Sequence, residues 1–105
     1  MKMVSIVILN WNGRQHLETF LPALVKHSSD PRAEIVVADN GSSDDSLNFM
    51  HKEYPRIRII ELDKNYGFSG GYNRAIEEIH SPYVLLLNSD IEVSEGWLDP
   101  MLEVM

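Results

Sequence analysis

A carboxylate lies at the end of the most apolar stretch of the chain. The run from Tyr83 to Leu87 is apolar, and Asn88, Ser89 and Asp90 follow it. A strand with apolar residues on both faces is expected to be buried beneath helices on both sides, as in a parallel α/β sheet. Ligands of such sheets bind beyond the carboxyl ends of the strands. Asp90 is therefore a carboxylate at a position where a ligand is expected to bind.

Three further polar loops each follow a segment that reads as a strand. Residues 3–9 and 33–38 are rich in β-branched residues, and residues 57–62 partly alternate, which favours a position nearer a sheet edge. The loops after these segments comprise residues 10–13, 39–44 and 63–71. The last of them is rich in glycine. If the strands are parallel, all four polar segments converge on one crevice.

Helical patterns separate the predicted strands. Apolar residues at three-and-four spacing predict an amphipathic helix over residues 14–26, with a kink or break near Pro22 because proline lacks a backbone donor. Ser42 or Ser43 is a candidate cap for a second helix, and residues 72–79 and 97–105 read as two more. Alternating strands and helices predict a doubly wound, mainly parallel α/β sheet with helices on both faces.

Composition limits the classes of function. The chain has 105 residues and 44% hydrophobic content, which suits a single domain over residues 1–105. Its formal charge of -7 argues against a surface that binds nucleic acid. It has no cysteine, which excludes disulfides and thiolate metal sites, and it has no apolar run long enough to span a bilayer. We expect a cytoplasmic location, or the cytosolic face of a membrane for a longer protein.

Four blocks together resemble a known family. VSIVILNWNG, EIVVADNGSSDDS, NYGFSGGYNRAI and YVLLLNSDIEV closely resemble the N-terminal, nucleotide-binding half of family 2 glycosyltransferases, especially the rhamnosyltransferase-like branch. The resemblance implies an incomplete GT-A fold. It also implies transfer of a sugar, with inversion, from a UDP- or dTDP-sugar to a glycan or lipid-linked acceptor in the biosynthesis of cell-surface polysaccharide. The general base of this family lies beyond the metal-binding element, and no residue here matches it.

The resemblance also assigns site residues, one motif position at a time. Asp90 is the expected ligand of Mg²⁺ or Mn²⁺, in a motif where Asn88 replaces the first aspartate of the family's Asp-x-Asp element. Trp11 is expected to stack on the base or, alternatively, to be an ordinary core or rim residue. Asp39 is expected to contact the nucleoside or, alternatively, to cap its own loop. The residues expected to bind the nucleotide sugar are Trp11, Asn12, Asp39, Gly41, Asn65, Gly71, Asn73, Asn88 and Ser89. Arg74 is open between a diphosphate contact and a surface charge, of which the surface is favoured, and the four histidines are expected at the surface.

Two other functions compete with this interpretation. A dinucleotide-binding oxidoreductase needs Gly-x-Gly-x-x-Gly after the first strand, and Asn10-Trp11-Asn12-Gly13 does not supply it. A non-catalytic nucleotide-binding or assembly module of the same fold stays open. The last apolar residues are expected to pack against structure further along a longer protein, or to mediate association of two copies. They are Trp97, Leu98, Met101, Leu102 and Val104.

Overall fold

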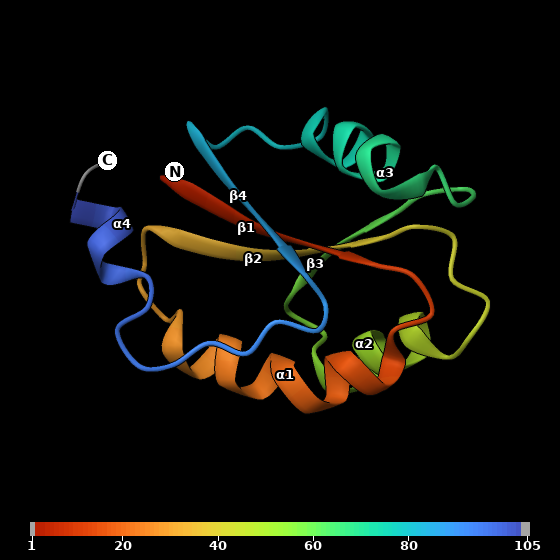
Figure 1. Cartoon of the computed structure of the whole chain (residues 1–105), viewed down its shortest axis with the longest axis horizontal. Coiled ribbons are helices and arrows are strands. Elements are labelled where there is room, and N and C mark those ends of the chain that lie inside the picture. Colours follow the sequence, from red (N-terminus) through yellow and green to blue (C-terminus); the bar gives the residue numbers. More distant parts are fainter. Residues whose placement is uncertain (1, 104–105) are drawn as a thin grey trace.

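The computed structural model describes residues 2–103 (Figure 1). Its elements in chain order are β1 (Val4–Asn10), α1 (Arg14–His27), β2 (Ala33–Asp39), α2 (Ser46–Glu53), β3 (Arg58–Glu61), α3 (Gly67–Ile76), β4 (Tyr83–Asn88) and α4 (Asp99–Glu103). Strands and helices alternate along the whole described chain, as the sequence predicts. The expected α/β class is confirmed.

The strands form one parallel sheet in the order β3-β2-β1-β4. Strand β1 lies in the middle and pairs with β2 from Val4↔Ala33 onward and with β4 from Val4↔Tyr83 onward. Strand β3 pairs with β2 at one edge, which agrees with the edge position predicted for residues 57–62. The carboxyl ends of β1, β2 and β4 therefore all lie at the same end of the sheet.

Helices cover both faces of this sheet. Helices α1 and α2 lie on one face, and α3 lies on the other (Figure 1). Side chains of β1 alternate between the two resulting cores: Ile6 packs with Leu17 and Leu21 of α1, whereas Val7 packs with Tyr72 of α3. Burial on both faces explains why β1 and β2 are apolar almost throughout.

Strand β4 is not the doubly covered strand that its composition suggests. Among residues 2–103 it pairs only with β1, so it lies at an edge of the sheet, and Tyr83 and Leu86 are 45% and 44% exposed. Helix α3 packs against β1 and β2, which leaves Leu86 open on that face. The expectation of complete burial was wrong because apolar composition shows that a strand can be covered, and does not show which neighbours cover it.

Three helices also differ from expectation. Helix α1 is continuous through Pro22, because Leu21 and Leu24 on its buried face pack into the core while Pro22 faces solvent. Helix α2 begins at Ser46, whose backbone N–H donates to Asp44 Oδ1 at 3.0 Å, so neither predicted serine caps it. Helix α3 begins at residue 67 rather than 72.

The apolar residues near the end of the described chain pack within the chain itself. Leu98 and Leu102 are 2% and 5% exposed and belong to the core beneath α1. Trp97 packs on this core and donates from Nε1 to Ser28 Oγ at 2.9 Å. The expectation that these residues need a partner elsewhere was therefore wrong for Leu98 and Leu102, because both are already buried in this core. Val104 lies outside the described residues.

Within residues 2–103, none of the helices has the length and apolar character that crossing a bilayer requires.

Candidate functional site

A cavity of about 410 Å³ opens where β1 and β4 end and α3 begins. Its volume falls within the range of typical small-molecule sites. The lining residues are Leu9, Trp11, His16, Asn40, Asn65, Gly67, Phe68, Asn88, Ser89 and Asp90. The structure therefore brings together five of the ten residues predicted for the site, namely Trp11, Asn65, Asn88, Ser89 and Asp90. It adds Asn40, Phe68 and His16, to which sequence reasoning gave no role in the site.

Two exposed aromatic side chains line the cavity. Trp11 is 54% exposed and Phe68 is 63% exposed, which is unusual for residues that gain so much from burial. The Phe68 ring meets the Tyr72 ring edge-on at a centroid distance of 5.0 Å. Tyr72 is itself fixed, because its hydroxyl donates to the Leu87 carbonyl at 2.5 Å and burial raises its pKa. The cavity therefore offers two aromatic surfaces, of which Phe68 is held by its neighbour.

The segment Asn88-Ser89-Asp90 brings an amide, a hydroxyl and a carboxylate to the cavity. Asn88 is the last residue of β4, and Asp90 is exposed just beyond it. No cluster of three or more His, Cys, Asp or Glu side chains that might hold a metal ion occurs among the described residues. Asp90 therefore fits a site in which the protein supplies one carboxylate and a bound ligand supplies other oxygens, as Mg²⁺ often requires.

Asp39 is buried at the end of β2 and organises its own loop. It is 2% exposed, and its Oδ1 accepts hydrogen bonds from Asn10 Nδ2 at 3.0 Å and Ser42 Oγ at 2.7 Å. Its Oδ2 accepts one from the Ser42 backbone N–H at 3.0 Å. The structure thus shows the loop-capping role that the sequence leaves open for Asp39. The predicted contact with a nucleoside stays a prediction.

Asn40 connects the end of β2 to the start of α3. Its Oδ1 accepts a hydrogen bond from Tyr66 N at 3.0 Å, and its Nδ2 donates to Asn65 Oδ1 at 3.2 Å and to the Gly67 carbonyl at 3.0 Å. These bonds, with Gly67 N donating to Asn65 Oδ1 at 2.7 Å, hold the first turn of α3 in place. They explain why the helix begins within the glycine-rich segment. The position of Asn40 directly after Asp39 is the only signal in the sequence that might have found it.

Asn12 joins the first and second loops rather than lining the cavity. Its backbone has a φ of 50°, a left-handed conformation that asparagine tolerates better than most residues. Asn12 Oδ1 accepts hydrogen bonds from the backbone N–H groups of Ser43 at 2.7 Å and Asp44 at 3.1 Å. Its own N–H donates to Ser42 Oγ at 2.9 Å. Three bonds thus fix loop 10–13 against loop 39–44.

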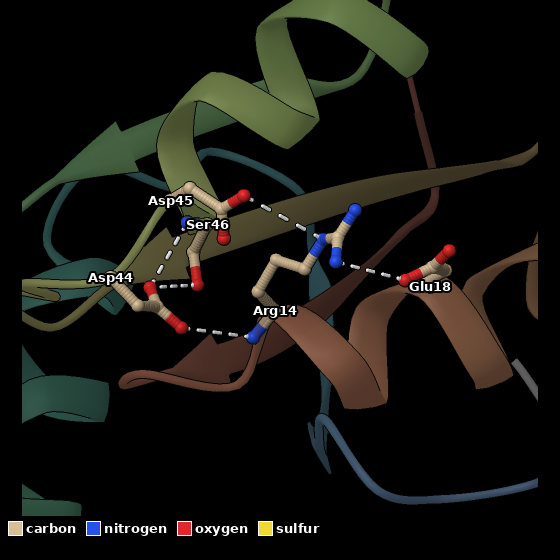
Figure 2. Close-up of polar contacts among 5 residues, drawn as sticks. All are labelled: Arg14, Glu18, Asp44, Asp45 and Ser46. Atoms are coloured by element: carbon tan, nitrogen blue, oxygen red, sulfur yellow. Dashed lines mark hydrogen bonds and ion pairs between the residues drawn. The ribbon is translucent and has the colours of Figure 1, made fainter.

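Asp44 extends this connection to the starts of α1 and α2 (Figure 2). Its Oδ1 accepts hydrogen bonds from Ser46, and its Oδ2 accepts one from the Arg14 backbone N–H at 3.2 Å. Burial alone would raise the pKa of Asp44, but the bonds from Ser46 and Arg14 outweigh burial and lower it. The Arg14 guanidinium lies between Glu18, at 3.2 Å, and Asp45, at 3.9 Å. The Asp44 carboxylate therefore holds the starts of α1 and α2 together.

The remaining predicted site residues lie away from the cavity lining. Gly41 has a φ of 75°, and a Cβ there would lie 2.5 Å from the Lys64 backbone. Gly71 is buried within α3, where its lack of a side chain lets the helix approach Asn40. Asn73 is exposed within the same helix. Their predicted contacts with a nucleotide sugar stay predictions.

Arg74 and His16 are two further polar side chains near the site. Arg74 is exposed, as expected, and its guanidinium stacks on the Tyr66 ring at 3.8 Å. His16 is also exposed, and it lines the cavity beside Trp11. The cavity as a whole offers flat aromatic surfaces, amides and the exposed carboxylate of Asp90.

Comparisons with known proteins agree with this arrangement. The family model described as Glycosyl transferase family 2 matches residues 5–105. The chain is 29% identical over 98 residues to a teichoic acid poly(glycerol phosphate) polymerase of Staphylococcus epidermidis, which covers 90% of this chain and 14% of that protein. It is 25% identical over 112 residues to an N-acetylglucosaminyl-diphospho-decaprenol L-rhamnosyltransferase of Mycobacterium tuberculosis, which covers 96% of this chain and 36% of that protein.

A solved structure has a fold similar to that of this chain. The crystal structure of Staphylococcus aureus TarS 1-349 in complex with UDP-GlcNAc superposes with a TM-score of 0.82 and 25% sequence identity. The match covers 98% of this chain and 30% of that one. The chain spans less than half the length of each of the curated relatives named above.

Proposed function

Because this chain belongs to glycosyl transferase family 2, we propose that the whole protein transfers a sugar from a nucleoside-diphosphate sugar to an acceptor hydroxyl. The observation that carries this proposal is the cavity at the carboxyl ends of β1 and β4, where aromatic, amide and carboxylate side chains meet. A nucleotide presents a flat base, a polar ribose and a charged diphosphate, and the cavity has a complement for each. The residues described above would therefore bind the donor.

The nucleoside is expected between Trp11 and the amides of the cavity. The exposed indole of Trp11 offers a stacking surface for a uracil or thymine base. Asn65 and Asn88 each carry an amide that can donate to and accept from ribose hydroxyls. Because Asn88 is uncharged, it can contact the sugar of the nucleoside without competing with Asp90 for a cation.

A divalent metal ion is expected at Asp90. Mg²⁺ and Mn²⁺ prefer carboxylate and phosphate oxygens, and Asp90 is exposed in the cavity beside two further oxygen-bearing side chains. When bound, the metal would neutralise charge on the departing nucleoside diphosphate. Asp90 would hold the ion, and Asn88 would orient the nucleoside.

The stereochemistry and the acceptor are finer parts of the proposal. Direct displacement at the sugar by an acceptor hydroxyl inverts its configuration and needs a general base to remove the acceptor's proton. The family resemblance matches that base to none of the residues 1–105. A glycan or lipid-linked acceptor is supported by the rhamnosyltransferase similarity, since that relative's name refers to a diphospho-decaprenol acceptor.

Calorimetry with UDP, dTDP and GDP, each with and without Mn²⁺ or Mg²⁺, tests the donor site. We expect UDP or dTDP to bind, and we expect the metal to strengthen binding in the wild type and not in Asp90→Asn. Asp99→Asn is the matched control, because Asp99 is an exposed carboxylate in α4 and does not line the cavity. Absence of nucleotide binding would refute the proposal. Binding by the whole protein without sugar transfer to any acceptor would favour the non-catalytic module.

A further inference from the structure

Asn10, the last residue of β1, has a completely buried side chain with one unsatisfied atom. Its Nδ2 donates to Asp39 Oδ1 at 3.0 Å and to Ser42 Oγ at 3.4 Å. These two acceptors fix the orientation of the amide, since only its nitrogen can donate. Asn10 Oδ1 has no hydrogen-bond donor among the described residues. Buried polar atoms are nearly always paired, so this oxygen marks a place where a donor is expected.

Ser89 carries the hydroxyl that can fill this role. The position of a Cβ on Gly13 would lie 2.5 Å from Asn10 Oδ1 and 3.0 Å from Ser89 Oγ. The two oxygens therefore border the same small space, which stays open because Gly13 has no side chain. A serine hydroxyl rotates freely and can act as donor. Ser89 also lines the cavity, so a ligand there can change its position.

We propose that Asn10 is a positioning residue for Asp90, and that the Ser89 hydroxyl donates to Asn10 Oδ1 when a nucleotide occupies the cavity. The proposal rests on the proposed function, because it assumes that Asp90 acts on the diphosphate. Asn10 then holds Asp39 through its amide nitrogen and the Ser89 side chain, next to Asp90, through its amide oxygen. One buried amide connects the loop after β2 to the segment after β4.

This role differs from direct contact with a ligand. The Asn10 side chain has no exposed surface and does not line the cavity, whereas Ser89 does. Asn10 can therefore influence a bound nucleotide only through the residues that it holds. Loss of the bond between Ser89 and Asn10 should reduce the gain in nucleotide affinity that the metal provides, because Asp90 is the residue next to Ser89.

The test compares UDP affinity with and without Mn²⁺ in four variants. Ser89→Ala removes the hydroxyl, Ser89→Thr retains it, Gly13→Ala places a methyl group between the two oxygens, and Ser94→Ala is the control. Ser94 is an exposed serine beyond Asp90 that does not line the cavity. From the net worth of one hydrogen bond, we expect Ser89→Ala and Gly13→Ala to lose roughly 2- to 12-fold of the gain in affinity that the metal provides. Ser94→Ala should keep that gain, and Ser89→Thr, which retains a hydroxyl, should lose less of it than Ser89→Ala.

Two further readouts separate positioning from a loss of structure. The melting temperature of Ser89→Ala should match that of the wild type, because the bond is made only with nucleotide bound. The double variant Asn10→Ala/Ser89→Ala should lose no more of the metal-dependent gain in UDP affinity than Asn10→Ala alone, since each residue acts through the other. If wild type binds UDP and Ser89→Ala keeps the full metal-dependent gain, the inference is wrong and Asn10 Oδ1 has another partner, such as a water molecule. If wild type binds no nucleotide, the proposed function itself fails.

Discussion

Replacing Trp11 tests the nucleotide site through a residue that the fold does not need. Trp11 is 54% exposed and belongs to neither core cluster, so Trp11→Ala should lower the melting temperature less than a substitution in the core does. Stacking of a base on an aromatic side chain is worth about 1–3 kcal/mol by alanine substitution. This loss corresponds to an increase in the Kd for UDP or dTDP of roughly 5- to 150-fold. Trp11→Phe retains an aromatic face and should fall between the wild type and Trp11→Ala.

Isothermal titration calorimetry measures these constants, and circular dichroism checks that each variant is folded. Tyr83→Ala is the matched control, because Tyr83 is an aromatic residue of similar exposure at the opposite end of β4. Six strand residues place it roughly 17 Å from the cavity end of that strand. Wild-type affinity in both Trp11→Ala and Trp11→Phe would refute the stacking argument and leave Trp11 as a rim residue. A similar loss in Tyr83→Ala would show that the effect is not specific to the cavity.

Three further predictions concern stability. Asp44→Asn should lower the free energy of unfolding at pH 7. Because folding lowers the pKa of Asp44 below the ordinary 3.8, the difference in stability between wild type and variant should shrink as the pH falls below 3.8. Urea unfolding at several pH values measures this difference. Gly41→Ala should lower the melting temperature by several degrees, since a left-handed φ costs about 1–2 kcal/mol and the added Cβ would lie 2.5 Å from the Lys64 backbone. Leu98→Ala should cost about 2–5 kcal/mol, and a cost near zero would contradict its burial against α1.

The sequence predicts those features that depend on local pattern. The apolar run that forms β1 and the spacing of Leu17, Leu21 and Leu24 in α1 reflect burial on a fixed face, and both elements lie within one residue of their expected bounds. The convergence of the strand-end loops follows from a parallel sheet, and Trp11 and Asp90 accordingly line one cavity. These conclusions need only hydrophobic periodicity and the direction of the chain.

Features that depend on distant partners were not predictable in this way. The start of α3 is decided by the Asn40 amide, which lies in the loop directly after β2, so the glycines at 67, 70 and 71 gave a misleading signal of a loop. The exposure of Leu86 depends on which helix covers β4. The Asn12 amide oxygen accepts hydrogen bonds from loop 39–44, a contact between segments far apart in the sequence, and the predicted contact of Asn12 with a ligand stays a prediction.

The pairing of β1 with β4 has a consequence for how the chain folds. Strand β1 can pair with β2 after one short crossover, but it meets β4 only after two further crossovers, when residues 4 and 83 come together. Pairings between residues so far apart in sequence form slowly, because closing a long loop costs entropy before any contact is gained. Strand β4 is therefore expected to join the sheet last and, as an edge strand, to exchange its amide hydrogens before β1 and β2 do. Asp90 would then acquire its position only at the final step of folding.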